Sequence, residues 1–256
     1  MERLLEKRVS YFFASHRRGR DDVRRTLRKL DGIGPLVVIG GMLRDLALFG
    51  NAHFRSDLDF VIDPIEPDLF ERKMNEMGAV LNRFGGYSLP ARKWRVDVWS
   101  LQKTWAQTAG YITIKDFDDL TYATFFSCDA ILYDLSTKKI TASDDYFAQM
   151  GRRIIEINLR PNPNPHGNAV RAFRYAILKG FRWGPQLTRF VAEMIDEGGW
   201  DSLADRERNS FRTCYIASLR RGDFELALRR HLSEAGARPF TPGLYLESKQ
   251  LELPFA

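Results

Sequence analysis

The stretch LVVIGGMLRDLALFGNAHFRSDLDFVID, residues 36–63, decides the fold of this chain. Its first, apolar residues are typical of a buried strand, and Gly40 with Gly41 predicts a turn. A short helix carrying Arg44 follows, and the last residues predict a second strand. The stretch therefore predicts a strand, a turn, a helix and a second strand in succession.

The second predicted strand carries Asp57 and Asp59. Side chains alternate across a strand, so both carboxylates face the same side, about 7 Å apart along the backbone. Two carboxylates on one face repel each other unless a cation lies between them. Hard oxygen ligands suit Mg²⁺, which keeps some waters and shares other positions with phosphate oxygens. The pair therefore predicts a metal site, and solvated carboxylates are the alternative.

The glycine pair predicts a complementary site for an anion. Without side chains at Gly40 and Gly41, the backbone can approach a phosphate closely, and the following helix presents its positive dipole end. Arg44, one turn into that helix, could reach the same anion. Either feature alone is common in proteins, but joined at this spacing they favour a nucleotide site.

The string GGMLRD followed by SDLDFVI resembles the head-domain signature of class II tRNA nucleotidyltransferases (CCA-adding enzymes) and bacterial poly(A) polymerases. This family belongs to the DNA polymerase β-like nucleotidyltransferases. The resemblance implies an α+β fold, in which a mixed sheet with flanking helices is followed by a small all-α neck domain. It also implies Mg²⁺-dependent transfer of a nucleoside monophosphate from an NTP to an acceptor hydroxyl, with an RNA or tRNA 3′ end as the favoured acceptor.

A third carboxylate lies in the segment RVDVWS, where Asp97 faces opposite to Val96 and Val98. A polar side chain in so apolar a strand needs a reason. The resemblance implies that Asp97 joins Asp57 and Asp59 as a metal ligand and helps to deprotonate the acceptor. The alternative is a charge on the solvent face of an amphipathic strand.

Residues 125–134, FFSCDAILYD, resemble the second head-domain motif of the family. Phe125 departs from that motif, because an acidic residue is usual there. The resemblance implies that Asp129 contacts the ribose of the nucleotide. A polar cap or turn residue is the alternative for Asp129.

The segment AVRAFRYAILKGF resembles the neck helix of the same family, and we expect Asn168 to be its N-cap. Arg171 and Arg174 lie three residues apart on one face, so both guanidinium groups can project towards a triphosphate or a primer end. CCA-adding enzymes carry E-D-x-x-R before this helix as the template that selects CTP or ATP. The matching positions here, Asn164, Pro165 and Asn168, have neither the acid nor the guanidinium. The resemblance therefore supports nucleotidyl transfer but not the writing of C-C-A.

Charge is unevenly distributed along the chain. Residues 1–30 carry 10 Lys and Arg against 4 Asp and Glu, residues 31–150 carry 12 against 17, and residues 151–256 carry 17 against 12. Basic ends around an acidic centre suit a protein that holds a polyanion near a cation-dependent site. Solvated Arg-rich helical faces are the alternative. The N-terminal arginines are candidates to track a phosphate backbone, and a solvated helical face is an equal alternative for them: Arg17, Arg18, Arg20, Arg24, Arg25 and Arg28.

The pattern predicts three regions: basic N-terminal helices over 1–30, a catalytic head over 31–160 and a helical neck-like domain over 161–256. Further helices are predicted near 68–77, 186–196, 203–219 and 224–232, and strands near 80–84 and 95–99. No apolar run is long enough to span a bilayer, and two cysteines, Cys128 and Cys214, without metal-site spacing are typical of a reducing cytoplasm.

Two other functions stay open on the sequence. One is a nucleotidyltransferase of a toxin or defence system that modifies tRNA, a protein or a small molecule, which the missing base-template residues and the small size also fit. The other is a catalytically silent RNA-binding module that retains the fold. Carboxylates at all three positions, Asp57, Asp59 and Asp97, count against silence.

Overall fold

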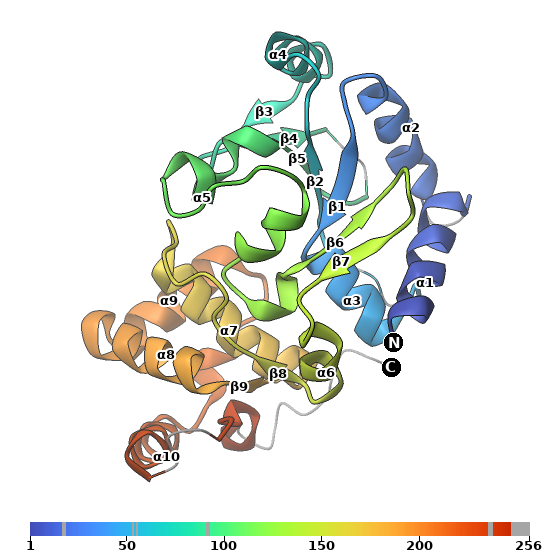
Figure 1. Ribbon diagram of the computed structural model, residues 1–256. Coiled ribbons are helices and arrows are strands. Elements are labelled where there is room, and N and C mark those ends of the chain that lie inside the picture. The colour runs from blue at the N-terminus through green and yellow to red at the C-terminus, as the bar shows by residue number, and fades with distance from the viewer. Residues whose placement is uncertain (17–18, 53, 55, 91–92, 235–237, 247–256) are drawn as a thin grey trace. The chain divides into compact units, whose positions relative to one another are not determined.

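The computed structural model describes residues 1–16, 19–52, 54, 56–90, 93–234 and 238–246 (Figure 1). The chain divides into two compact units, Met1–Phe147 and Ala148–Ala256. The first unit contains the sheet and also the two N-terminal helices, and the second is mostly helical. The division falls earlier in the chain than the predicted limit at 160, and the N-terminal helices are not a unit of their own.

The first unit is built on a seven-stranded sheet with the order β3-β4-β5-β2-β1-β6-β7. Its outer strands are β3 (Val80–Leu81), β4 (Tyr87–Leu89) and β7 (Ile140–Ala142). Its central strands are β1 (Leu36–Ile39), β2 (Leu58–Ile62), β5 (Val96–Ser100) and β6 (Ile131–Asp134). Strands β2 and β5 run parallel, whereas β1 pairs antiparallel with both β2 and β6. The sheet is therefore mixed, and the α+β fold expected from the sequence is confirmed.

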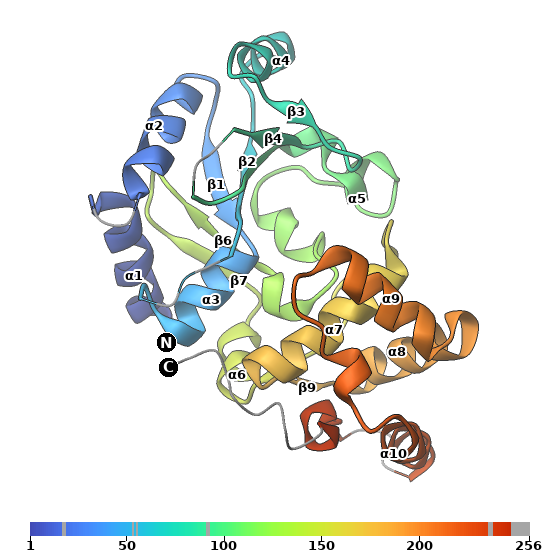
Figure 2. The same cartoon turned by 180° about the vertical axis from the view of Figure 1, so that it is seen from behind.

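Helices cover one face of this sheet. They are α1 (Glu2–Ala14), α2 (Arg20–Leu30) and α3 (Gly41–Phe49), seen beside β1, β6 and β7 in Figures 1 and 2. Phe13 of α1 packs on Phe60 of β2 with ring centroids 6.3 Å apart. Arg8 donates to the carbonyl oxygens of Leu46 and Ala47, each at 2.8 Å, near the C-terminal end of α3. A cation there satisfies helix carbonyls and opposes the negative end of the helix dipole, so Arg8 fixes α1 on α3.

The opposite face of the sheet has its own apolar cluster. Val37, Val61 and Leu132 from the sheet pack with Leu101, Ile114 and Leu120 from the segment between β5 and β6. This segment contains the helix α5 (Trp105–Thr108) and a short 3-10 helix at Asp118–Tyr122. Because side chains alternate along β1 and β2, Val37 and Val61 serve this face while Val38 and Phe60 serve the helical face.

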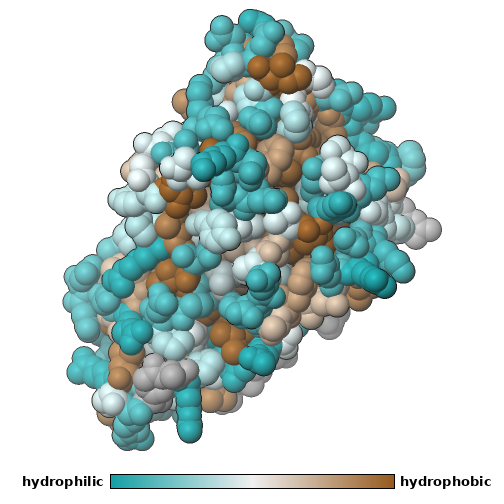
Figure 3. Space-filling view, viewed as in Figure 1, coloured by the Kyte–Doolittle hydropathy of each residue, from teal (hydrophilic) through white to brown (hydrophobic). Residues whose placement is uncertain are grey.

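The edge of the sheet differs from the sequence-based prediction. The predicted strand over 80–84 is only β3 (Val80–Leu81), and a strand that the sequence analysis missed, β4 (Tyr87–Leu89), pairs with it after the glycine turn. Val80 and Leu81 are 68% and 61% exposed, and Figure 3 shows apolar surface in that part of the molecule, near α4 (Pro67–Glu76). An exposed apolar edge strand can pair with a strand of another chain. Because β3 has only two residues, it offers few backbone groups for such pairing.

The second unit is held together by aromatic side chains. Phe173 of α7 (Pro165–Lys179) makes edge contacts with Trp183 and Trp200, and Phe224 of α10 (Arg221–Glu234) packs against the same group. The helices α8 (Pro185–Gly198) and α9 (Trp200–Ser210) and the two-stranded pair β8 (Ile154–Ile155) and β9 (Arg182–Trp183) complete this unit. The second unit also contains the 3-10 helices at Ile216–Ser218 and Pro242–Tyr245. The 3-10 helices at Leu101–Lys103 and Ser127–Asp129 belong to the first unit, and α6 (Tyr146–Gly151) spans the division at Phe147.

The predicted single helix over 203–219 is wrong. Helix α9 ends at Ser210, and Phe211 takes an extended conformation as its C-cap. The carboxylate of Glu207 accepts hydrogen bonds from the backbone N–H groups of Tyr215 and Ile216, each at 2.8 Å, which turns the chain back on the helix. No helix among the described residues is long and apolar enough to cross a membrane.

Candidate active site

Two of the predicted metal ligands are direct neighbours in the sheet. Asp59 of β2 lies opposite Asp97 of β5 in the parallel register. Paired residues of adjacent strands project to the same face, so the two carboxylates share the face that also carries Val37 and Leu132. Asp59 is half-buried and Asp97 is 7% exposed. The fold therefore brings two carboxylates together from segments that are far apart in the sequence.

Asp97 also has partners of its own. Ser88 of β4, which lies opposite Asp97 in the register, donates its hydroxyl to the carboxylate. The guanidinium of Arg95 lies 3.0 Å from the same carboxylate and is about half exposed. Asp97 is therefore not a charge on a solvated face, because the two contacts orient a nearly buried carboxylate beside Asp59.

Asp57 takes a different position from the one expected. It lies before the first residue of β2, and its side chain is exposed. No three His, Cys, Asp or Glu side chains in the described part of the chain lie together as a metal ligand set. The three-carboxylate cluster of Asp57, Asp59 and Asp97 is thus not assembled in this structure. The prediction failed because alternation determines the facing of side chains only within a strand, and Asp57 precedes the first residue of β2.

The glycine pair lies next to the two carboxylates. Ile39, the last residue of β1, is opposite Asp59, and Gly40 follows with φ 71° and ψ −126°, a conformation that only glycine adopts readily. The N–H of Gly40 donates to the carbonyl oxygen of Ile131 at 3.0 Å. The first N–H groups of α3, which begins at Gly41, have no partner within the helix and point back from its N-terminus. A helix N-terminus of this kind can accept an anion, so an anion site at this turn stays a prediction.

Arg44 and Asp129, predicted as separate nucleotide contacts, are paired with each other. Arg44 is 3% and Asp129 7% exposed, and Arg44 Nη1 donates to the Asp129 carboxylate. Arg44 Nε also donates to Asp45 at 2.8 Å, and Asp45 accepts a hydrogen bond from the hydroxyl of Ser56. This buried network ties the first turn of α3 to the start of β6 and to the segment before β2. Both charges are thereby used within the protein.

The two arginines of the neck-like helix belong to the second unit. Arg174 forms an ion pair of 2.8 Å with Glu207, whose side chain is fully buried, and also donates to the carbonyl oxygen of Thr213 at 2.7 Å. Its guanidinium carbon lies 3.9 Å from the centroid of the Phe211 ring. Arg171 is exposed, and its Nη2 donates to the hydroxyl of Tyr175 at 2.7 Å. Arg174 thus holds the turn after α9, and Arg171 is the more accessible of the two.

The positions that match the base template have structural tasks. Asn164, and not Asn168 as predicted, is the N-cap of α7, and its side chain accepts the N–H of Gly167 at 3.3 Å. Arg206 donates to the same side-chain oxygen. Asn168 lies inside the helix and is 7% exposed. Helix α7 begins earlier than expected because Pro165 can occupy the first helical position, where its missing N–H costs nothing.

The N-terminal arginines are also used differently from the expectation. Arg17 and Arg18 lie outside the described residues. Arg20 is 3% exposed, and its guanidinium carbon lies 4.6 Å from the centroid of the Phe12 ring, so it does not track a phosphate backbone. Arg24 and Arg25 pair with the acids three residues before them on α2. The basic character of this region is therefore partly balanced within its own helix.

Sequence reasoning missed three residues that build the site in the first unit, which are Ser56, Asp45 and Ser88. It also missed Glu207, the partner of Arg174 in the second unit. The sequence could have indicated Asp45, because an acid directly after Arg44 in the first turns of a helix offers a nearby partner. It could not have indicated Ser88 or Glu207, because their partners lie on other elements.

Together, the mixed sheet, the carboxylate pair and the glycine turn define an α+β fold with a candidate nucleotide site. No family model matches the chain, and no curated protein matches it. Among solved structures, the chain resembles a CCA-adding enzyme in complex with CTP, with a TM-score of 0.56 and 18% identity over 91% of this chain and 53% of that one. It also resembles the Thermotoga maritima CCA-adding enzyme complexed with tRNA, with a TM-score of 0.54 and 16% identity over 88% and 53%. A CCA-adding enzyme with ATP gives a TM-score of 0.54 at 16% identity, over 89% and 53%.

At these identities the likeness concerns the fold. The chain spans about half the length of the solved structures that it resembles. The mixed α+β sheet with its flanking helices matches the head domains of CCA-adding enzymes.

Proposed function

We propose that this chain is a Mg²⁺-dependent nucleotidyltransferase that transfers a nucleoside monophosphate from an NTP to an acceptor hydroxyl, with release of pyrophosphate. The observation that carries the proposal is the register of Asp59 with Asp97, one strand away from the glycine turn after Ile39. The fold likeness to CCA-adding enzymes supports the same class of reaction.

The donor set at the candidate site fits magnesium. Mg²⁺ is commonly bound by one or two protein carboxylates, with water and substrate phosphates in its other positions. Asp59 and Asp97 supply two such carboxylates on one face, and Asp57 is a proposed third ligand once a nucleotide is bound. When bound, Mg²⁺ would neutralise charge on the phosphates and favour the ionised acceptor hydroxyl.

The protein's own groups would orient the reaction. The N–H groups of residues 41–43 at the start of α3 would bind phosphate oxygens, since the positive end of the helix dipole favours an anion there. Gly40 would keep the chain close to the triphosphate, and Asp97 would accept the proton of the acceptor hydroxyl. Arg44 and Asp129 would act as positioning residues that hold the glycine turn in place, because their charges are paired with each other.

An RNA 3′ end is the acceptor that we favour. The chain carries a formal net charge of +6, and basic residues dominate both ends of the sequence. Arg171 is proposed as a contact for the polyanion because it is exposed, whereas Arg174 is held by Glu207 within the second unit. The template positions Asn164 and Asn168 serve the helix, which favours an enzyme that does not select C-C-A.

A labelling experiment tests the proposal. Purified protein is incubated with Mg²⁺ and each labelled NTP, with total RNA or without it. We expect label to enter RNA. We also expect Asp59→Asn and Asp97→Asn to lower the rate by at least about a hundredfold, since a change in a residue that only supports a metal ligand already costs about 10- to 100-fold. Asp63→Asn is the matched control, because Asp63 is an exposed acid just after β2. Label in a protein or small product would support the toxin or defence alternative, and RNA binding without any labelling would refute catalysis.

A further inference from the structure

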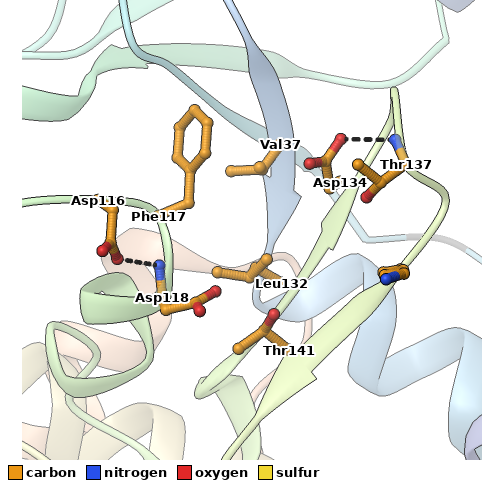
Figure 4. Close-up of a pocket in the computed structure, with 9 residues that line it drawn as sticks. Val37, Asp116, Phe117, Asp118, Leu132, Asp134, Thr137 and Thr141 are labelled. Carbon is orange, nitrogen blue, oxygen red and sulfur yellow. Dashed lines mark hydrogen bonds between the residues drawn. The ribbon is translucent and has the colours of Figure 1, made fainter.

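A cavity of about 410 Å³ opens on the first unit, on the same face of the sheet as Asp59. Its floor is apolar and consists of Val37 from β1, Leu132 from β6 and the ring of Phe117 (Figure 4). Val37 and Leu132 belong to the apolar cluster of this face, against which Phe117 packs. The cavity therefore has a firm floor that is part of the core.

This cavity is separate from the candidate active site. Both lie on the same face of the sheet, but the carboxylate pair lies on β2 and β5, whereas the cavity uses β1, β6 and β7, towards the β7 edge. Val37 lies near the start of β1, opposite Asp134, whereas the glycine turn follows the end of that strand. None of the residues that line the cavity is assigned a role in nucleotidyl transfer.

The charge of the lining selects the kind of ligand. The lining contains three acids, Asp116, Asp118 and Asp134, and one basic residue, Lys139. A phosphate-bearing ligand would be repelled by this excess of negative charge. Burial would raise the pKa of Asp134, but hydrogen bonds from the side chain of Ser136 and from the backbone of Thr137 outweigh it and lower the pKa. Asp134 is thus ionised at neutral pH, and the cavity favours a cation.

The spacing of the acids distinguishes an organic cation from a metal ion. In Figure 4, Asp116 and Asp118 lie on one side of the apolar floor, and Asp134 lies on the other side. Asp116 accepts the N–H of Asp118 at 2.9 Å, and Asp134 accepts the N–H of Thr137 at 3.1 Å, so each acid is held by its own turn. Within the described residues no three such side chains meet at one point as metal ligands. A ligand that uses both sides needs two positive charges joined by an apolar spacer.

We propose that this cavity binds an aliphatic diamine or polyamine. One ammonium group lies at Asp118, whose carboxylate points towards Leu132 in Figure 4, and another lies at Asp134. The methylene chain covers Val37 and Leu132 and contacts the Phe117 ring. Burial of methylenes on this apolar floor stabilises the complex.

Calorimetric titration of the full chain with spermidine and with putrescine, at low salt, tests the proposal. We expect saturable binding that Asp118→Asn and Asp134→Asn each weaken by about fivefold, the size of one exposed charge contact. Asparagine keeps the carbonyl oxygen that the hydrogen bonds to Asp134 need. Lys139→Gln changes binding in the opposite direction and should strengthen it, because a like charge is removed. Asp144→Asn is the matched control, since Asp144 is an exposed acid that does not line the cavity.

Each outcome decides the question. Weaker binding in the two aspartate variants together with stronger binding in Lys139→Gln supports the site. Equal binding in Asp118→Asn, Asp134→Asn and Asp144→Asn would show only general attraction to a negative surface and would overturn it. Complete displacement by MgCl₂ at matched ionic strength would assign the cavity to a metal ion and would also overturn it. Because the readout is binding, its failure is independent of any failure of nucleotidyl transfer.

Discussion

At the scale of residues, the candidate site depends on the buried network around Arg44. Arg44 pairs with Asp45 in its own helix and with Asp129 in a distant segment. Its two acids, Asp45 and Asp129, are 4% and 7% exposed. Arg44→Met leaves both buried carboxylates without this guanidinium, and removal of one partner of a buried pair costs about 3–5 kcal/mol. We expect the free energy of unfolding of the first unit to fall by that order in urea denaturation.

The double variant Arg44→Met with Asp129→Asn is the control for this prediction. It removes one of the stranded charges, so the loss of stability should be smaller than in Arg44→Met alone. A variant Arg44→Met of unchanged stability whose KM for the NTP rises would instead assign Arg44 to the phosphates, as the sequence alone suggested.

A second prediction at this scale concerns pH. A hydrogen bond from Tyr87 to Glu71 raises the pKa of Tyr87 to about 12. The protonated tyrosine is favoured in the folded protein, so its contribution to stability is complete below pH 10 and is lost as the pH rises from 10 to 12. Tyrosine ionisation can be followed by ultraviolet absorbance in the wild-type protein and in Glu71→Gln. We expect the titration midpoint of one tyrosine to move down towards pH 10 in the variant.

At the scale of elements, helix α8 is capped by a residue from outside its own segment. The carboxylate of Glu156, which follows β8, accepts the backbone N–H groups of Gln186 at 3.0 Å and Leu187 at 2.6 Å. Gly184 leaves room for it, because a Cβ there would lie 2.4 Å from a carboxylate oxygen of Glu156. An acid at a helix N-terminus satisfies N–H groups that have no partner in the helix and interacts well with the dipole.

Glu156→Ala should therefore lower the free energy of unfolding of the second unit by about 1–2 kcal/mol, the usual cost of a lost N-cap. Glu197→Ala, at the exposed C-terminal end of the same helix, is the matched control. There the acid opposes the dipole, so its removal should leave stability unchanged or slightly higher. Equal losses in the two variants, measured by urea unfolding with circular dichroism, would refute the capping role.

At the scale of the whole molecule, the excess of positive charge is the property that bears on the acceptor. The chain has a sequence pI of about 9.4. If RNA is bound through phosphate contacts, its affinity should fall by about tenfold or more between 50 and 200 mM salt, since each contact releases counterions. Filter binding of a labelled tRNA across this range measures the slope. Salt-independent binding would contradict an acceptor held by its backbone.

The sequence by itself determined the strand, turn, helix and strand over residues 36–63, because a buried strand, a glycine turn and an amphipathic helix leave local patterns. It also determined the helical character of the C-terminal half. Alternation within their own strands predicted that Asp59 and Asp97 are candidate metal ligands. These features depend on residues close together in the chain, so a linear pattern is sufficient to reveal them.

Only the tertiary structure decided which of these residues meet. The parallel register places Asp97 beside Asp59, while Asp57 falls outside the strand. Arg44 pairs with Asp129, 85 residues away, and Arg174 with Glu207, 33 residues away, so that three of the predicted nucleotide contacts are held within the protein. Ion pairs and strand order are set by packing between distant segments, and such contacts leave no periodic trace in the sequence.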